Sequence, residues 1–389
     1  MKYVCSKNKC TGCMACVSSC PKKAIKIQDD MHVINAVIDE SVCIDCGLCH
    51  KVCQVCSPVE LKKPILWTQG WSEKFRMKSS SGGFAAAISH SFIESGGVVC
   101  SCVFCDGEFV FDIAKTHEQV LNFTGSKYVK SNPIRAYQIT KDELLKGKKC
   151  LFIGLPCQVA GLKNTLSEEL RSNLYTIDLI CHGSPSAKLL DYYLTQHGYP
   201  LSGLESIYFR DKEKFGITSK RQMLSKYGAS DCYTIAFLNS LTYTENCYSC
   251  AYAKIERAGD LTIGDSWGSD LPKEEKRNGI SLAICQTMKG KELLQSANLT
   301  TFDVDSEKAI SFNHQLAHPS IAPGAYNPFF KAIEENKNFD LQVWKVYPRL
   351  CMRQWVKKVL IRITNGICGG AMEALIKSAR AGGERFWHE

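Results

Sequence analysis

Cysteine is the residue type in this sequence whose spacing most clearly predicts chemistry. The chain of 389 residues contains 22 cysteines, and eight of them form two copies of one pattern. Cys10, Cys13, Cys16 and Cys20 are separated by two, two and three residues, and Cys43, Cys46, Cys49 and Cys53 repeat this spacing. Three cysteines at this pitch hold one side of a four-iron cluster, whereas the fourth reaches the other cluster. The repeat therefore predicts a ferredoxin-like module with two [4Fe-4S] clusters.

The two predicted clusters each take their last ligand from the other motif. We assign Cys53 to the cluster of Cys10, Cys13 and Cys16, and Cys20 to the cluster of Cys43, Cys46 and Cys49. Pro21 follows Cys20 as is usual for this motif, but Gln54 follows Cys53, which leaves Cys56 as a competing ligand. Zinc is the alternative metal, although zinc modules usually present cysteine pairs separated by longer gaps.

Four later cysteines lie in three short motifs. Cys157 and Cys181 come directly after β-like runs, in IGLPCQVAGL and IDLICHGSPS, and NCYSC contains Cys247 and Cys250. Open α/β sheets bind ligands at the carboxyl ends of their strands, and a pair of cysteines spaced by two residues offers two thiolates to one metal. These four residues can therefore supply one further metal site. Lone cysteines such as Cys100 and Cys285 are expected to be small buried hydrophobic residues.

Ser80, Ser81, Gly82 and Gly83 directly precede the apolar stretch FAAAI. Free N–H groups and the positive end of a helix dipole could receive a phosphate here. An N-cap followed by a tight turn would produce the same residues.

Regular elements must position these residues. Apolar runs such as GGVVCSCVF, KKCLFIG, LYTIDLIC, DLTIGD and ISLAICQT alternate with helix-like stretches at residues 84–94 and 187–196. This alternation predicts α/β or α+β layers. Between the two cysteine motifs, apolar runs on either side of Asp29 and Asp30 predict a β-hairpin that covers the clusters.

The composition favours a globular redox protein. Hydrophobic residues make up 45% and charged residues 22% of the chain, which is ordinary for such proteins. An apolar run of membrane-spanning length and a signal-peptide stretch are both missing, so we expect a cytoplasmic location. There, 22 cysteines indicate metal or redox chemistry rather than disulfides. Much of the net charge of +9 would balance anionic cofactors, and no nucleic-acid partner is expected.

Three segments follow from these patterns. We predict a cluster module at residues 1–62, a mixed α/β domain at 63–345, and a basic amphipathic helical tail at 346–389. In the tail, Met352, Trp355, Val356, Val359, Leu360 and Ile363 recur at helical spacing, with Arg349, Arg353, Lys357 and Arg362 between them. Two uses compete: the apolar stripe packs on the domain, or the helix docks an acidic ferredoxin or an anionic membrane face.

The motifs SSSGGFAAAI, GSKYVKS, GLPCQVAGL, DLICHGSPS, CYSC and DLTIGDSWG, taken in this order, resemble one known family. It is the family of the beta subunit of coenzyme F420 hydrogenase and dehydrogenase. The resemblance covers nearly the whole chain to about residue 330. It implies an α/β domain that holds FAD and a four-iron cluster, with a ferredoxin module fused at the N-terminus.

The resemblance also implies roles for individual residues. Cys157, Cys181, Cys247 and Cys250 would bind the third [4Fe-4S] cluster, and Ser80, Ser81, Gly82, Gly83, Ser126 and Lys127 would contact the flavin. Asp265 and Trp267 could line the flavin pocket, and His182 could orient the cluster or relay a proton. As simpler alternatives, Lys127 is a solvated lysine, Trp267 packs in a buried turn, and His182 is only hydrogen-bonded.

The implied activity is an iron–sulfur flavin oxidoreductase. Electrons would pass between a ferredoxin or another electron-transfer protein, the clusters, FAD and a small organic acceptor, either deazaflavin-like or related to polysaccharide biosynthesis. The alternatives are an electron-transfer subunit of a larger complex and a redox module without a substrate of its own.

Overall fold

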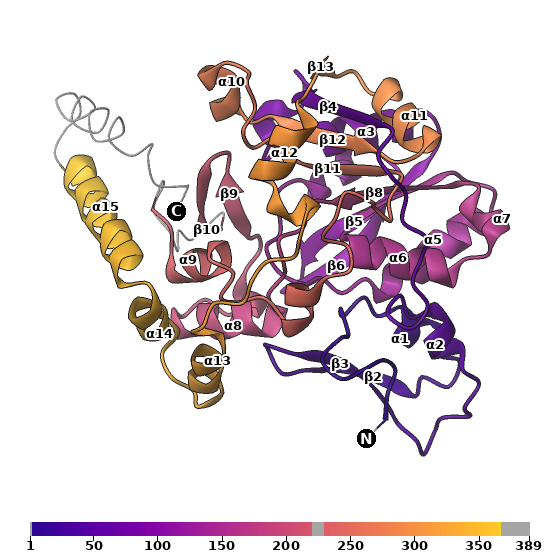
Figure 1. The fold of residues 1–389 in the computed structure, drawn as a ribbon, viewed down its shortest axis with the longest axis horizontal. Coiled ribbons are helices and arrows are strands. Elements are labelled where there is room, and N and C mark those ends of the chain that lie inside the picture. The colour runs from indigo at the N-terminus through magenta and orange to yellow at the C-terminus, as the bar shows by residue number, and fades with distance from the viewer. Residues whose placement is uncertain (1, 220–228, 367–389) are drawn as a thin grey trace.

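The computed structural model describes residues 2–219 and 229–366. Figure 1 shows a small module at the N-terminus, a large sheet with helices on both faces, and a helical group that ends in one long helix at the edge of the molecule.

The N-terminal module contains a three-stranded antiparallel sheet in the order β1-β3-β2. Its elements are β1 (Lys2–Tyr3), α1 (Ala15–Ser19), β2 (Ile25–Asp29), β3 (Ile34–Ile38) and α2 (Leu48–Val52). The predicted hairpin is confirmed, because β2 pairs with β3 from Ile25 opposite Ile38 to Asp29 opposite Ile34. Each short helix begins inside a cysteine motif. The two helices contact each other, and they lie between the hairpin and the large domain (Figure 1).

The large sheet has eight strands in the order β13-β4-β12-β11-β8-β7-β5-β6. The strands are β4 (Leu66–Trp71), β5 (Val98–Cys105), β6 (Glu108–Ala114), β7 (Cys150–Gly154), β8 (Leu174–Leu179), β11 (Leu261–Asp265), β12 (Ser281–Cys285) and β13 (Thr300–Phe302). The central strands β5, β7, β8 and β11 are parallel, and antiparallel strands flank them on both sides. The carboxyl ends of the central strands therefore meet at one edge of the sheet.

Helices cover both faces of this sheet, so its strands are nearly continuous apolar runs. The helices around the sheet are α3 (Phe84–Glu94), α4 (His117–Val120), α5 (Ile134–Leu145), α6 (Pro156–Thr165), α7 (Glu168–Arg171), α10 (Lys273–Asn278), α11 (Met288–Ser296) and α12 (Ser306–Phe312). On one face, α3 and α11 share a core with Leu151. On the other, α5 and α6 share a core with Phe152, and this core continues into the N-terminal module.

A second helical group packs beside the sheet. It contains α8 (Ala187–Gln196), α9 (Cys232–Leu238), α13 (Tyr326–Glu334), α14 (Phe339–Val346), α15 (Pro348–Gly366) and the hairpin of β9 (Tyr208–Asp211) and β10 (Lys214–Thr218). Short 3-10 helices connect the elements at Arg76–Lys78, Leu121–Phe123, Leu201–Gly203, Glu245–Ser249 and His314–Leu316.

The sequence prediction of the fold class is confirmed. The helices predicted at 84–94 and 187–196 are α3 and α8, and the apolar runs form β5, β7, β8, β11 and β12. Within the described residues, none of the helices is both long and apolar enough to span a membrane.

Candidate iron–sulfur and flavin sites

Cys10, Cys13, Cys16 and Cys53, here called set one, are buried where the N-terminal module meets the large domain. Burial raises the pKa of the Cys13 thiol to about 12, with smaller contributions from the neighbouring Cys10, Cys157 and Cys53. The Gly12 N–H donates to the Cys10 sulfur at 3.5 Å, a bond that would stabilise a thiolate. Cys13, Cys10 and Cys53 also raise the pKa of Cys16, so the four thiols are near one another; their shared cluster stays a prediction.

Cys5, which the sequence analysis did not single out, also contacts set one. Its thiol hydrogen-bonds to Cys10 and Cys53, and these bonds are the largest cause of its raised pKa. Cys56, the predicted competitor of Cys53, is exposed and donates to the Val4 carbonyl at 3.3 Å. Both Cys5 and Cys56 hydrogen-bond to Cys53, so the assignment of Cys53 over Cys56 stays a prediction.

Cys20, Cys43, Cys46 and Cys49, here called set two, line one cavity of about 170 Å³ at the surface of the module. A single water needs only about 10–15 Å³, so this cavity can hold a much larger group. Main-chain N–H groups donate to Cys20 and Cys43 at 3.3 and 3.4 Å. Cys46 is exposed, whereas all of set one is buried, so the two predicted clusters would differ in their access to solvent.

Cys157, Cys181, Cys247 and Cys250, here called set three, come together from the carboxyl ends of β7 and β8 and from the Glu245–Ser249 turn. Burial raises the pKa of Cys157 to about 12, with Cys250 and Cys247 adding to the shift. Cys181 has a raised pKa for the same reasons, with contributions from the other three cysteines. Among the described residues, no group of three or more His, Cys, Asp and Glu side chains is arranged to hold a single metal ion.

Lys130 lies between set one and set three. Its ammonium group donates to the Thr11 carbonyl at 3.0 Å, next to Cys10. Its main-chain N–H donates to the carbonyl of Pro185, four residues after Cys181, at 2.8 Å. Burial lowers the pKa of Lys130, but cysteines of both sets outweigh burial and raise it. One positive charge is therefore shared by two thiol sets, although the sequence analysis singled out Lys127 in the same motif.

Gln54, which stands where a proline usually follows this motif, makes two side-chain hydrogen bonds. The Gln54 amide donates to the Thr11 hydroxyl at 3.0 Å, and its carbonyl accepts from the buried Tyr252 hydroxyl. Tyr252 lies two residues after Cys250, so this side chain connects set one to set three. Nearby, a Cβ at Gly161 of α6 would lie 3.2 Å from the Cys13 sulfur. The absence of a side chain there allows α6, which carries Cys157, to approach set one closely.

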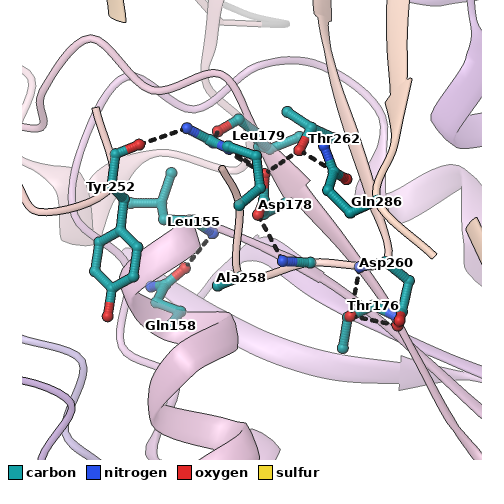
Figure 2. Close-up of polar contacts among 12 residues, drawn as sticks. Leu155, Gln158, Thr176, Asp178, Leu179, Tyr252, Ala258, Asp260, Thr262 and Gln286 are labelled. Carbon is teal, nitrogen blue, oxygen red and sulfur yellow. Dashed lines mark hydrogen bonds and ion pairs between the residues drawn. The ribbon is translucent and has the colours of Figure 1, made fainter. Parts of the chain in front are cut away.

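A buried ion pair fixes the strand and the loop that carry set three. Asp178 in β8 accepts from the guanidinium of Arg257 at 2.9 and 3.1 Å, and both side chains are almost fully buried. Asp178 also accepts from the Gly259 N–H at 2.8 Å and from the Thr262 hydroxyl at 2.8 Å, which Figure 2 shows beside it. Every oxygen of this carboxylate is thus satisfied. The network ties Cys181, three residues after Asp178, to the segment that follows Cys250.

The predicted flavin residues are close together at the same edge of the sheet. The Ser126 N–H donates to the Ser80 hydroxyl at 3.0 Å, and the Ser81 hydroxyl donates to the Ile280 carbonyl. The buried ammonium of Lys127 donates to the carbonyls of Phe123 and Thr124 at 2.9 and 3.1 Å. Burial lowers the pKa of Lys127, and an anion bound beside the ammonium would raise this pKa again.

Close packing explains the two glycines of this loop. A Cβ at Gly82 would lie 2.3 Å from the Gly70 carbonyl oxygen and 2.6 Å from the Ser281 nitrogen. Gly83 has a φ of 86° at the start of α3, a conformation that favours glycine. A larger residue at Gly82 would displace β4, so it would not test phosphate binding specifically.

Two cations that the sequence analysis missed reach this edge from the β9–β10 hairpin. Arg210 forms a bidentate pair with Asp265 at 2.6 and 3.0 Å, and its guanidinium lies 5.7 Å from the ring centre of Trp267. The Lys212 ammonium donates to the carbonyls of Arg76, Ser79 and Ser81. Burial and the nearby Arg76 lower the pKa of Lys212 to about 8.

His182, beside Cys181, is hydrogen-bonded through its Nδ1 to Gln315 at 2.6 Å. Burial lowers its pKa to about 4, and the neighbouring His314 contributes to this shift. The imidazole is therefore neutral near pH 7.

These thiol sets and the large sheet define an iron–sulfur electron-transfer protein with a ferredoxin-like module. Residues 9–56 match the family model of the 4Fe-4S dicluster domain, and residues 147–306 match that of the C terminus of the coenzyme F420 hydrogenase/dehydrogenase beta subunit. The chain thus carries a domain of the coenzyme F420 hydrogenase/dehydrogenase beta subunit family behind an iron–sulfur dicluster domain. The predicted resemblance is confirmed.

The proteins similar to this chain include a curated relative and a chain of known structure. An uncharacterized protein from Methanocaldococcus jannaschii is 26% identical in an alignment of 194 positions that covers 42% of this chain and 54% of that protein. The chain therefore matches about half the length of this curated relative. A chain in the structure of the F420-reducing [NiFe] hydrogenase complex from Methanosarcina barkeri aligns with a TM-score of 0.47 and 19% identity, over 66% of this chain and 91% of that chain.

Proposed function

We propose that this protein is a cytoplasmic iron–sulfur flavin oxidoreductase in which set two, set one and set three each bind a [4Fe-4S] cluster and pass electrons to FAD. The observation that carries the proposal is the meeting of set one and set three around Lys130. Clusters bound at set one and set three would be neighbours, as electron transfer from the N-terminal module to the large domain requires.

The residues near the sheet edge fit a dinucleotide. Ser80, Ser126 and Lys127 provide hydroxyl and ammonium groups, and Lys212 adds a second cation beside the same loop. Trp267 and Arg210 offer an aromatic surface and a fixed positive charge. A bound flavin would store two electrons and exchange them singly or as a hydride.

The chain's own residues would bind the clusters, adjust their reduction potentials and hold their ligands in place. Lys130 would balance the negative charge of two clusters, and the N–H groups that donate to Cys10, Cys20 and Cys43 would stabilise their thiolates. Neutral His182 would hold the segment after Cys181 through Gln315. We propose a ferredoxin-type donor and a small organic acceptor, deazaflavin-like or related to polysaccharide biosynthesis. The match to the family of the coenzyme F420 hydrogenase/dehydrogenase beta subunit supports the proposal that another electron-transfer protein is the partner.

Iron, sulfide and flavin contents of the anaerobically purified protein test the proposal. Three clusters predict about twelve irons per chain, together with FAD. A variant with Cys247→Ser and Cys250→Ser should lose about four irons, whereas Cys285→Ser, which changes a buried cysteine in β12, should lose none. A content of about eight irons in the unmodified protein would contradict the proposed third cluster. Iron without flavin would favour an electron-transfer module with no substrate of its own.

A further inference from the structure

The long helix α15 turns its apolar side to solvent. Met352, Trp355, Val356 and Leu360 are 51%, 54%, 43% and 52% exposed. Met352, Val356 and Leu360 are four residues apart, and Trp355 lies three residues after Met352, so the four share one face of the helix. Of the two alternatives for this stripe, packing on the domain is therefore not seen for these four side chains; Ile363 and Arg362 lie where no side chains are described.

A different side of α15 attaches the helix to the protein. Cys351 is buried, and the Gln354 side chain accepts from the Ser230 N–H at 3.0 Å. The helix contacts α14 and α9 on this side. Cys351 and Gln354 thus attach the helix to the protein. The apolar face of Met352, Trp355, Val356 and Leu360, here called the α15 face, remains exposed and could contact another surface.

Positive charge borders the α15 face. Residues 347–361 include Arg349, Arg353, Lys357 and Lys358 and no Asp or Glu. Arg349, Arg353 and Lys357 are four residues apart and all exposed, so they form one row along the edge of the apolar face. Tryptophan and aliphatic residues beside such a row are typical of helices that lie in the headgroup region of an anionic bilayer.

We propose that the α15 face binds an anionic lipid surface, with the helix lying parallel to the membrane. An acidic redox protein would meet the same positive charge. However, α15 and the N-terminal module lie on opposite sides of the molecule (Figure 1), so a donor on α15 would be far from the solvent-accessible set two. A contiguous apolar face also exceeds what a purely electrostatic encounter requires.

Vesicle flotation of the full anaerobic protein tests this inference. The protein should bind equimolar phosphatidylcholine–phosphatidylserine vesicles and bind phosphatidylcholine vesicles more weakly. Arg349→Glu with Arg353→Glu should lower binding to the anionic vesicles at least about tenfold. Trp355→Ser with Leu360→Ser should weaken binding to both kinds. All four side chains are solvent-exposed, so iron content should stay unchanged.

Matched controls separate this role from general surface effects. Lys141→Glu with Lys148→Glu changes two exposed lysines elsewhere, and Ile321→Ser removes an apolar side chain that is 79% exposed; both variants should bind like the unmodified protein. The proposal is overturned if the unmodified protein ignores phosphatidylserine. It is also overturned if Trp355→Ser instead turns a dimer into a monomer, or if the Arg variants lose only binding to an acidic ferredoxin.

Discussion

The positive charge of Lys130 lies near the thiols of set one in the N-terminal module and of set three in the large domain. The ammonium group touches the chain beside Cys10 and interacts with cysteines of set three. A nearby cation stabilises the reduced, more negative state of a cluster, and this raises its reduction potential.

We therefore expect Lys130→Gln to lower the reduction potentials of set one and set three together. The shift should be roughly tens of millivolts, where 59 mV is a tenfold change for one electron. Redox titration followed by electron paramagnetic resonance measures both potentials. Lys130→Arg should restore them, and Lys289→Gln, whose ammonium group binds carbonyls at Arg171 and Leu174, should change neither. Unchanged potentials in Lys130→Gln would show that the lysine only packs.

Lys212 makes a pH-dependent prediction. Its pKa of about 8 means that the ammonium is charged below this pH and loses its charge as the pH rises through it. If the flavin phosphates lie by Ser79–Ser81, flavin affinity should be constant below about pH 8 and fall above it, by at most tenfold per pH unit. Fluorescence titration with FAD from pH 6 to about 9.5 follows this affinity. Lys212→Arg should abolish the fall, and identical profiles for the two proteins would place the phosphates elsewhere.

At the scale of elements, β8 and the loop before β11 are joined by Asp178 and Arg257. Breaking a buried ion pair leaves one charge without a partner, which destabilises a protein by about 3–5 kcal/mol. Because this pair lies between the segments of Cys181 and Cys250, its loss should loosen set three first.

Asp178→Asn should therefore lower the denaturant midpoint of unfolding and release iron at lower denaturant than the unmodified protein does. Asp270→Asn is the matched control, since Asp270 is 74% exposed and pairs with Lys308 at the surface. Exposed pairs contribute only about 0–1 kcal/mol. Equal effects of the two substitutions would mean that the buried network does not hold set three in place.

At the scale of the whole molecule, set two is the thiol set that contains an exposed cysteine, Cys46. Its cavity is lined by Lys22 and His50, Lys51 is exposed nearby, and Ile44 is 57% exposed. We call the surface formed by Lys22, Ile44, His50 and Lys51 the donor face, because its positive charge would attract a negatively charged electron donor. Set one lies deeper, between the donor face and set three.

Charge reversal by Lys22→Glu and Lys51→Glu should slow reduction by an acidic ferredoxin and flatten its salt dependence, since salt screens such attraction over about 10 Å at 0.1 M. Stopped-flow absorbance at several ionic strengths measures both effects. The Lys141→Glu and Lys148→Glu variant serves as the control, and iron contents should match. If reduction by ferredoxin is equally fast in all three proteins, the donor binds elsewhere.

The sequence determined the local features of this protein. Cysteine spacing predicted the dicluster module, apolar periodicity predicted β5, β7, β8, α3 and α8, and ordered motifs predicted the family; each of these depends on residues close together in the chain. The tertiary structure alone decided which distant residues meet. Lys130 hydrogen-bonds to Thr11, Gln54 accepts a hydrogen bond from Tyr252, and Arg210 pairs with Asp265. Helical spacing showed that α15 is amphipathic, but only packing decided that its apolar face remains exposed, because Cys351 and Gln354 already attach the helix.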